Sequence, residues 1–232
     1  MRLAIMQPYF LPYIGYFQLI AAADVFIMYD NIKYTKKGWI NRNRMLLNGA
    51  DTVFSLPLKK ASDSLNVIDR QLTDDFYPDK LLAQFKGAYS RAPFFSETFP
   101  LLETIVLNGE RNLFAYIYNS IIEVCRFLEI QTEIRISSAI AIEHDLKSQD
   151  KVLSLCQATG ADTYINTSGG LELYSIDAFK RRDIELKFIK SKQLEYAQFG
   201  APFVPWLSIV DVLMFNPLDV VREYIYTNYE YI

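Results

Sequence analysis

The sequence predicts an α/β fold built on a mainly parallel β-sheet. Two stretches of the 232-residue chain support this prediction, one at residues 3–29 and one at residues 133–166. In each stretch a β-rich run, a helical pattern and a second β-rich run follow one another, which is the order of a βαβ unit. Such units place parallel strands in one sheet, so the sequence predicts a Rossmann-like layout, with a helical insert and a β-hairpin added to it.

The first βαβ unit begins with an apolar strand at residues 3–5. Residues 6–16 then carry two prolines, which stiffen a turn before the helical pattern of residues 17–20. Residues 25–29 are continuously apolar and β-rich, which is typical of a strand covered on both faces. The unit therefore places the turn and the helix start at the carboxyl edge of the sheet, where anionic ligands usually bind.

An antiparallel hairpin follows the first unit. Residues 44–47 and 52–56 are β-rich and flank Asn48 and Gly49, a pair that tolerates the positive φ angles of a tight turn. Residues 59–75 are polar and have no sustained period, which predicts a surface loop or lid.

Three helices are predicted next, at about residues 78–90, 94–106 and 110–129. The third has the clearest apolar stripe. We interpret these helices as an insert of about residues 78–130 within a single α/β domain that comprises residues 1–232.

The second βαβ unit has strands at residues 133–136 and 163–166. The helix between them, at residues 149–159, ends at Gly160, which can adopt the left-handed conformation of a helix C-terminus.

The C-terminal part adds a strand and two helices. Apolar and charged residues alternate over residues 184–188, which predicts a half-exposed strand at the edge of the sheet. Residues 208–214 and 218–229 are predicted to be helices separated by Asn216 and Pro217.

The composition argues against several classes of protein. A formal net charge of −3 argues against a general nucleic-acid-binding protein, whose surface would be basic. Two prolines, Gln18 and Asp24 interrupt the apolar residues 8–29, so this stretch matches neither a membrane span nor a signal peptide. Cys125 and Cys156 lie in apolar helical patterns, which is typical of reduced thiols. We therefore expect a cytoplasmic protein with no transmembrane segment and no nucleic-acid partner, and a homodimer is left open.

The turn of residues 7–16 is the first candidate binding segment. Gly15 would let a ligand approach the backbone, and Gln7 offers a donor and an acceptor near the strand end. The tyrosines could stack on a base or a sugar; alternatively, the prolines and aromatics simply pack a helix against the sheet. The candidate ligand-binding residues of this turn are Gln7, Pro8, Tyr9, Tyr13, Gly15 and Tyr16.

Part of this turn resembles the nucleotidylyltransferase signature, in which a phenylalanine and a proline precede a histidine, any residue, a glycine and a second histidine. The matching residues are Phe10, Pro12, Tyr13, Gly15 and Tyr16, so tyrosine stands at both histidine positions. Because histidine can carry a positive charge toward a phosphate and tyrosine cannot, the resemblance supports the fold more than the activity.

Residues 30–44 form the second candidate segment, a basic loop rich in planar side chains. Residues 31–50 carry five lysines and arginines and no acidic residue, which indicates a small anionic ligand in an acidic protein. Arginine binds phosphate or carboxylate bidentately and lysine acts as a point charge, although a solvated loop would look similar. The candidate ligand-binding residues are Tyr34, Trp39, Asn41, Arg42 and Arg44, and the candidate catalytic residues are Asp30, Lys36 and Lys37. Asp30 would act as a base or would bind a magnesium ion carried by a nucleotide, the one candidate cofactor.

Thr167, Ser168, Gly169 and Gly170 follow a predicted strand and form the third candidate ligand-binding segment. Their backbone N–H groups and hydroxyls could form a phosphate nest, although an ordinary strand-to-helix turn has the same composition. His144 is the only histidine of the chain, so a structural zinc site is not expected, and an acid or base role requires that it reach the pocket.

Residues 6–20 and 29–44 look like the WbqC-like protein family, and residues 160–170 and 203–211 are similar to its later segments. The resemblance implies a bacterial cytoplasmic protein linked to the assembly of O-antigen or another surface polysaccharide, without a settled activity. The positions that match the family motif are Gln7, Pro8, Pro12, Gly15, Tyr29, Asp30, Lys36, Lys37, Gly38, Trp39, Asn41 and Arg42.

We expect the three candidate segments to meet around one cavity for a small anionic or phosphorylated ligand. The first hypothesis is a nucleotidyl- or acyltransferase that acts on a nucleotide-linked or phosphorylated sugar in bacterial surface-polysaccharide biosynthesis. The second is a non-catalytic nucleotide- or sugar-phosphate-binding protein on a degenerate nucleotidylyltransferase-like scaffold. A third, a scaffold within a glycan-assembly complex, would depend on an exposed aromatic patch made by Tyr224, Tyr226, Tyr229 and Tyr231.

Overall fold

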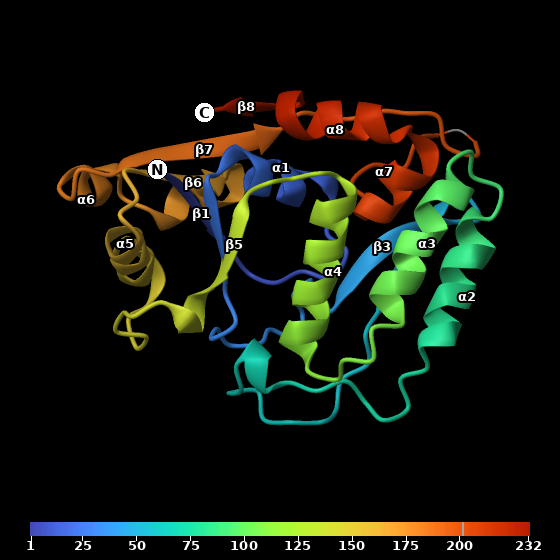
Figure 1. Cartoon of the computed structure of the whole chain (residues 1–232), viewed down its shortest axis with the longest axis horizontal. Helices are drawn as coiled ribbons and strands as arrows, with labels where there is room; N and C mark the ends of the chain where they lie inside the picture. The colour runs from blue at the N-terminus through green and yellow to red at the C-terminus, as the bar shows by residue number, and fades with distance from the viewer. Residues whose placement is uncertain (201) are drawn as a thin grey trace.

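The computed structural model describes residues 1–200 and 202–232, and its strands form two sheets (Figure 1). The strands are β1 (Arg2–Met6), β2 (Val25–Met28), β3 (Arg42–Leu47), β4 (Ala50–Ser55), β5 (Glu133–Ile136), β6 (Thr163–Thr167), β7 (Glu185–Ser191) and β8 (Tyr229–Tyr231). In this part of the chain, the larger sheet has the order β5-β2-β1-β6-β7-β8, and β3 pairs with β4 in the smaller one. Pairing is parallel from β5 to β7 and antiparallel between β7 and β8. The predicted α/β fold with a mainly parallel sheet and a hairpin is therefore confirmed.

Helices cover both faces of the larger sheet, and each face has its own apolar core. On β1, Leu3 and Ile5 pack among residues of α5 and α6, whereas Ala4 lies on the opposite face among residues of α1. Figure 1 shows α5 and α6 near one end of the molecule and α2, α3 and α4 grouped near the other. The helices are α1 (Ile14–Ala22), α2 (Pro78–Tyr89), α3 (Phe95–Val106), α4 (Leu113–Phe127), α5 (Ser148–Thr159), α6 (Ile176–Lys180), α7 (Ile209–Phe215) and α8 (Leu218–Thr227).

Local sequence signals account for several element boundaries. Asn48 and Gly49 have φ angles of 52° and 79°, as a tight turn between β3 and β4 requires. Gly160 has a φ angle of 72° and ends α5 in the left-handed conformation. Asn112 accepts a hydrogen bond from the backbone N–H of Ala115, so α4 begins three residues later than predicted.

Two predictions for the C-terminal part are wrong. The strand predicted at residues 184–188 is β7, but it does not lie at the sheet edge because β8 pairs with it. The helix predicted to extend to residue 229 ends at Thr227, and Asn228 then leads into the three-residue strand β8. β7 has a neighbour on each side, and Phe188 and Ile189 in its middle are both buried, so its exposure does not alternate along the strand.

Helices α2 and α3 are joined to the rest of the structure by buried polar contacts. The hydroxyl of Tyr89 accepts from the backbone N–H of Leu46 and donates to Asp211 Oδ1, both at 2.9 Å. Thr98 Oγ1 donates to the carbonyl of Leu213 at 3.0 Å. These contacts join α2 and α3 to the hairpin and to α7. The division of the chain into one domain with a helical insert stays a prediction.

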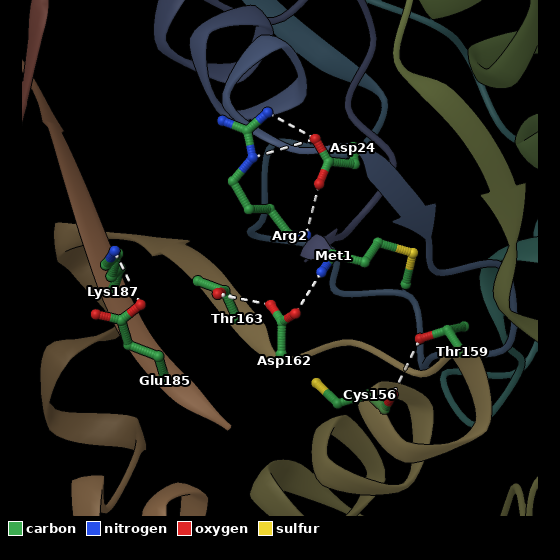
Figure 2. A network of polar contacts seen from close by, with 9 residues as sticks. All are labelled: Met1, Arg2, Asp24, Cys156, Thr159, Asp162, Thr163, Glu185 and Lys187. Atoms are coloured by element: carbon green, nitrogen blue, oxygen red, sulfur yellow. Dashed lines mark hydrogen bonds and ion pairs between the residues drawn. The ribbon is translucent and has the colours of Figure 1, made fainter. Parts of the chain in front are cut away.

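Ion pairs hold the amino-terminal edge of the larger sheet, opposite its carboxyl edge. Figure 2 shows Arg2 bound through two nitrogens to Asp24, and the amino group of Met1 bound to Asp162 at 2.6 Å. These contacts join the starts of β1, β2 and β6. Since they are solvent-exposed, these ion pairs contribute little to stability. Within residues 1–200 and 202–232, no helix is both long and apolar enough to cross a bilayer.

Candidate functional site

A cavity of about 750 Å³ opens at the carboxyl ends of β1, β2 and β6. We call it the strand-end cavity. The chain leaves β1 toward β2 and β5 on one side and later returns to β6 and β7 on the other, so the strand order reverses between β1 and β6. Parallel α/β sheets bind their ligands at such reversals, because the loops diverge there and leave a crevice. The strand-end cavity therefore occupies the place where this fold class binds ligands.

Lys151, in the first half of α5, is a nearly buried cation in the wall of the strand-end cavity, with 7% of its surface exposed. Its Nζ donates to Asn31 Oδ1 at 3.1 Å and to the Asn31 carbonyl at 3.5 Å, and lies 5.5 Å from the ring centroid of Tyr29. Among the described residues, no carboxylate forms an ion pair with Lys151. Burial lowers the pKa of Lys151, while the more distant charges of Asp30 and Asp145 oppose this shift.

The first turn of α5 adds further positive potential to the strand-end cavity. Lys147 and Ser148 line it, and Lys147 at the N-cap position provides no side-chain cap. The start of α5, which also carries Asp150 in its first turn, therefore borders the same space as Lys151. Lys33, which follows β2, contributes another cation to the lining, and Asp145 a carboxylate. This arrangement is suited to binding an anion.

Asn31 connects Lys151 to His144. The Asn31 side chain contacts Lys151 Nζ through Oδ1 and His144 Nδ1, at 2.9 Å, through Nδ2. His144 lines the strand-end cavity, so the only histidine of the chain reaches the pocket. Such a group can act on a bound ligand as a hydrogen-bond donor, a base or an acid.

Asp30 is fully buried and does not line the strand-end cavity. Its Oδ1 accepts from Ser137 Oγ at 2.8 Å and from the Ser138 N–H at 3.0 Å, and its Oδ2 accepts from Ser138 Oγ. Because protein donors already occupy both oxygens, Asp30 does not fit the predicted role of magnesium ligand or base. In the described part of the chain, no cluster of three histidine, cysteine or acidic side chains is suited to hold a metal ion.

Lys36 and Lys37, the other candidate catalytic residues, are solvent-exposed and also lie outside the cavity lining. Lys36 pairs with Asp63 at 2.8 Å, and the carbonyl of Lys37 accepts a hydrogen bond from Arg42.

The planar side chains of the basic loop mainly hold the loop itself. Arg42 donates to the carbonyls of Gly38 and Lys37, and Asn41 joins the Tyr34 hydroxyl to the carbonyl of Leu56. Arg44 pairs with Asp51 and donates to the carbonyl of Trp206, and Trp39 lies beside both arginines. The loop places Asn31 and Lys33 in the cavity lining, but not Tyr34, Trp39, Asn41, Arg42 or Arg44.

The first turn contributes one of its six candidates, Gln7, to the cavity lining. Its carbonyl accepts a hydrogen bond from the buried Tyr16 hydroxyl at 2.8 Å. Gly15 serves close packing, because a Cβ atom there would lie 2.4 Å from both Ser191 Oγ and the Tyr13 ring. Pro8 is buried, Tyr9 packs edge-on against Tyr16, and Tyr13 packs edge-on against Trp206.

Thr167, Gly169 and Gly170 line the strand-end cavity, whereas Ser168 does not. They lie at the junction of β6 and the 3₁₀ helix η3 (Ser168–Leu173). Gly170 is required by packing, since a Cβ atom there would lie 2.9 Å from Asn166 Nδ2. At Gly169 an added Cβ atom would lie 3.9 Å from Thr167 Oγ1, so packing does not require a glycine there.

Sequence reasoning missed several residues of the cavity lining, among them Asn31, Lys33, Lys147 and Lys151. One signal for Lys151 was available. It lies four residues before Leu155 on the apolar stripe of α5, where an unpaired lysine is unusual. His144 had no such signal, since it lies 113 residues from Asn31 in the chain.

Comparison with known proteins places the chain in a family. The uncharacterized protein Rv1507c of Mycobacterium tuberculosis is 28% identical to it over 220 residues, which cover 93% of each protein. No solved structure matches the chain. The model of the WbqC-like protein family matches residues 7–223. The chain therefore belongs to the WbqC-like protein family.

Proposed function

We propose that the protein binds a nucleotide-linked or phosphorylated sugar in the strand-end cavity. We further propose that it is a cytoplasmic transferase that moves a nucleotidyl or acyl group during the synthesis of a bacterial surface polysaccharide. Membership of the WbqC-like family supports the proposed link to surface polysaccharides, and the lining of the strand-end cavity supports the proposed phosphate-bearing ligand.

The observation that carries this proposal is the burial of Lys151 without a carboxylate partner among the described residues. An ammonium group has three N–H donors and no acceptor. Among the described residues, only Asn31 accepts hydrogen bonds from Lys151 Nζ. Burying such a charge costs free energy unless an anion compensates it. A phosphate in the strand-end cavity would supply that compensation, together with acceptors for the N–H groups at the start of α5.

The size and lining of the strand-end cavity fit the same ligand class. Its volume of about 750 Å³ lies within the range of roughly 300–1,000 Å³ that small-molecule sites occupy. Tyr29, Tyr174 and Leu173 give it apolar surface on which a base or a sugar could pack.

A thermal-shift panel of nucleotides, nucleotide sugars and sugar phosphates, with and without Mg²⁺, tests the proposed ligand. A compound at about 100 times its Kd stabilises the folded protein by roughly 2.7 kcal/mol. Simple sugars without phosphate serve as the matched control. If no phosphate-bearing compound raises Tm, the proposal is wrong. Compounds that bind are then incubated with the protein and candidate acceptors, and mass spectrometry detects transfer.

The second candidate function is a non-catalytic nucleotide- or sugar-phosphate-binding protein. The placement of the candidate catalytic residues favours it, because Asp30 is enclosed by its own hydrogen bonds and Lys36 pairs with Asp63 on the surface. Saturable binding without any detectable transfer would support this second function.

A further inference from the structure

The orientation of the Asn31 side-chain amide follows from its neighbours. Lys151 Nζ can only donate, and it lies 3.1 Å from Asn31 Oδ1. The oxygen end of the amide therefore faces Lys151, and the Nδ2 end faces His144, whose Nδ1 lies 2.9 Å away. Because Nδ2 can only donate, His144 Nδ1 must accept.

The accepting role of Nδ1 decides which ring nitrogen of His144 carries the proton. A neutral imidazole has one donor and one acceptor nitrogen, so the proton lies on Nε2. Among the described residues, Nε2 has no hydrogen-bond partner, while the side chain lines the strand-end cavity. The N–H group at Nε2 is thus the polar atom that His144 can offer to a ligand.

A buried polar cluster holds the Asn31 side chain in place. The single hydroxyl proton of Ser137 is shared between two acceptors, Asn31 Oδ1 at 2.7 Å and Asp30 Oδ1 at 2.8 Å, and Ser138 donates to Asp30 through its backbone N–H. Ser137 and Asp30 are fully buried. Asp30 therefore helps to fix the position of Ser137. The contact between Ser137 and Asn31 in turn limits rotation of the Asn31 amide.

We propose that Asn31 is a positioning residue that holds His144 in the form protonated on Nε2, and that His144 donates this proton in a hydrogen bond to the anion bound at Lys151. The inference rests on the proposed ligand and adds one ligand-contacting residue to its site. Lys151, the His144 Nε2–H group and the N–H groups at the start of α5 are all donors, so together they select a ligand group that only accepts, such as phosphate or sulfate.

The single histidine makes the ring form directly measurable. Protein labelled with ¹⁵N in histidine gives one pair of ring nitrogens in NMR spectra, and these distinguish the two neutral forms. At neutral pH we expect the proton on Nε2. In Asn31→Asp a carboxylate oxygen faces Nδ1, and we expect the proton to move to Nδ1. A wild-type ring protonated on Nδ1 would overturn the proposal.

Sulfate titrations at constant ionic strength test the contact with the anion. We expect wild-type protein to bind sulfate with a shift of the Nε2–H signal. His144→Leu removes the donor and should weaken binding by about 10- to 150-fold, the usual cost of one hydrogen bond to a charged group. His144→Gln keeps an N–H donor and should bind within about threefold of wild type. Equal affinity of wild type and His144→Leu would overturn the contact.

The two proposals fail in different ways. If neither sulfate nor any phosphate-bearing compound of the panel binds the wild-type protein, the proposed ligand class is wrong, and the ring spectrum still decides the role of Asn31. If the affinity for sulfate depends on Lys151 but not on His144, the proposed ligand class survives and the inference about His144 is overturned.

Discussion

Replacing Lys151 by methionine tests the chemistry of the strand-end cavity with a measurable magnitude. The substitution keeps an unbranched apolar side chain, one atom shorter, and removes the ammonium that donates to Asn31 Oδ1. A hydrogen bond between a charged group and a ligand contributes about 1.5–3 kcal/mol, so affinity for a phosphate-bearing compound should fall by about 10- to 150-fold.

The assay is the ligand-induced change in Tm, with the panel compound that shifts Tm the most. For a chain of 232 residues, 1 kcal/mol corresponds to about 2–4 °C. Wild-type protein at about 100 times Kd should therefore gain about 5–11 °C. A hundredfold weaker variant at the same concentration gains only about 0.4 kcal/mol, or about 1–2 °C.

Lys86→Met is the matched control, because Lys86 lies on the exposed face of α2 and does not line the strand-end cavity. It should keep the full ligand-induced shift. An unchanged shift in Lys151→Met would refute the assignment of Lys151 as the anion-binding residue, whatever the variant does to stability.

The pH dependence of stability gives an independent check on the burial of Lys151. Burial lowers its pKa below the value of 10.5 for the unfolded chain. At pH values below the folded-state pKa, the buried charge lowers the free energy of unfolding by its full amount. This loss becomes smaller as pH rises from there toward 10.5, because the folded protein releases its proton before the unfolded chain does. The free energy of unfolding of wild type, measured relative to Lys151→Met, should therefore increase as pH is raised through this window.

Three further predictions concern the framework. Gly15→Ala should lower the free energy of unfolding by about 1–3 kcal/mol because its Cβ would overlap neighbouring side chains, whereas Gly87→Ala, with no atom within 4 Å of the added Cβ, should raise it by up to about 1 kcal/mol. Equal changes of the two variants in urea unfolding would contradict the packing at Gly15. Tyr16→Phe loses a 2.8 Å hydrogen bond to the backbone at the end of β1 and should cost about 1 kcal/mol in the same assay. Burial raises the pKa of both Cys125 and Cys156 to about 12, so neither should react with a thiol reagent at pH 8 until urea unfolds the protein; rapid reaction of the native protein would show that one is accessible.

The parts of the fold that could be predicted depend on short-range physics. Asn48 and Gly49 adopt positive φ angles because the turn requires them, and Gly160 does so because it ends a helix. The β8 strand could not be predicted, because three residues carry no period and their extended conformation comes from pairing with β7. The edge position predicted for β7 is wrong for the same reason.

The candidate site was harder to predict than the fold because its composition was misleading. The basic loop has the residue types of a phosphate-binding segment. However, Arg42 donates to carbonyls of the loop itself, and Asn41 donates to the carbonyl of Leu56. The nearly buried cation, Lys151, lies in helix α5, and its hydrogen-bond partner Asn31 lies 120 residues away in the sequence. Only the sheet topology brings the two together, so no local window of the sequence contains this site.

The starts of α1 and α5 differ in what surrounds them, and this difference supports the proposed place of the anion. The start of α1 faces a cavity of about 30 Å³, which Trp206 and Leu207 help to line and which has room for little more than a water molecule. Tyr16, at one of the two histidine positions of the nucleotidylyltransferase signature, uses its hydroxyl to hold the backbone. The start of α5 instead opens on the strand-end cavity beside Lys151. The first turn thus serves as a packed support, and the anion that we propose would bind beside the start of α5 instead.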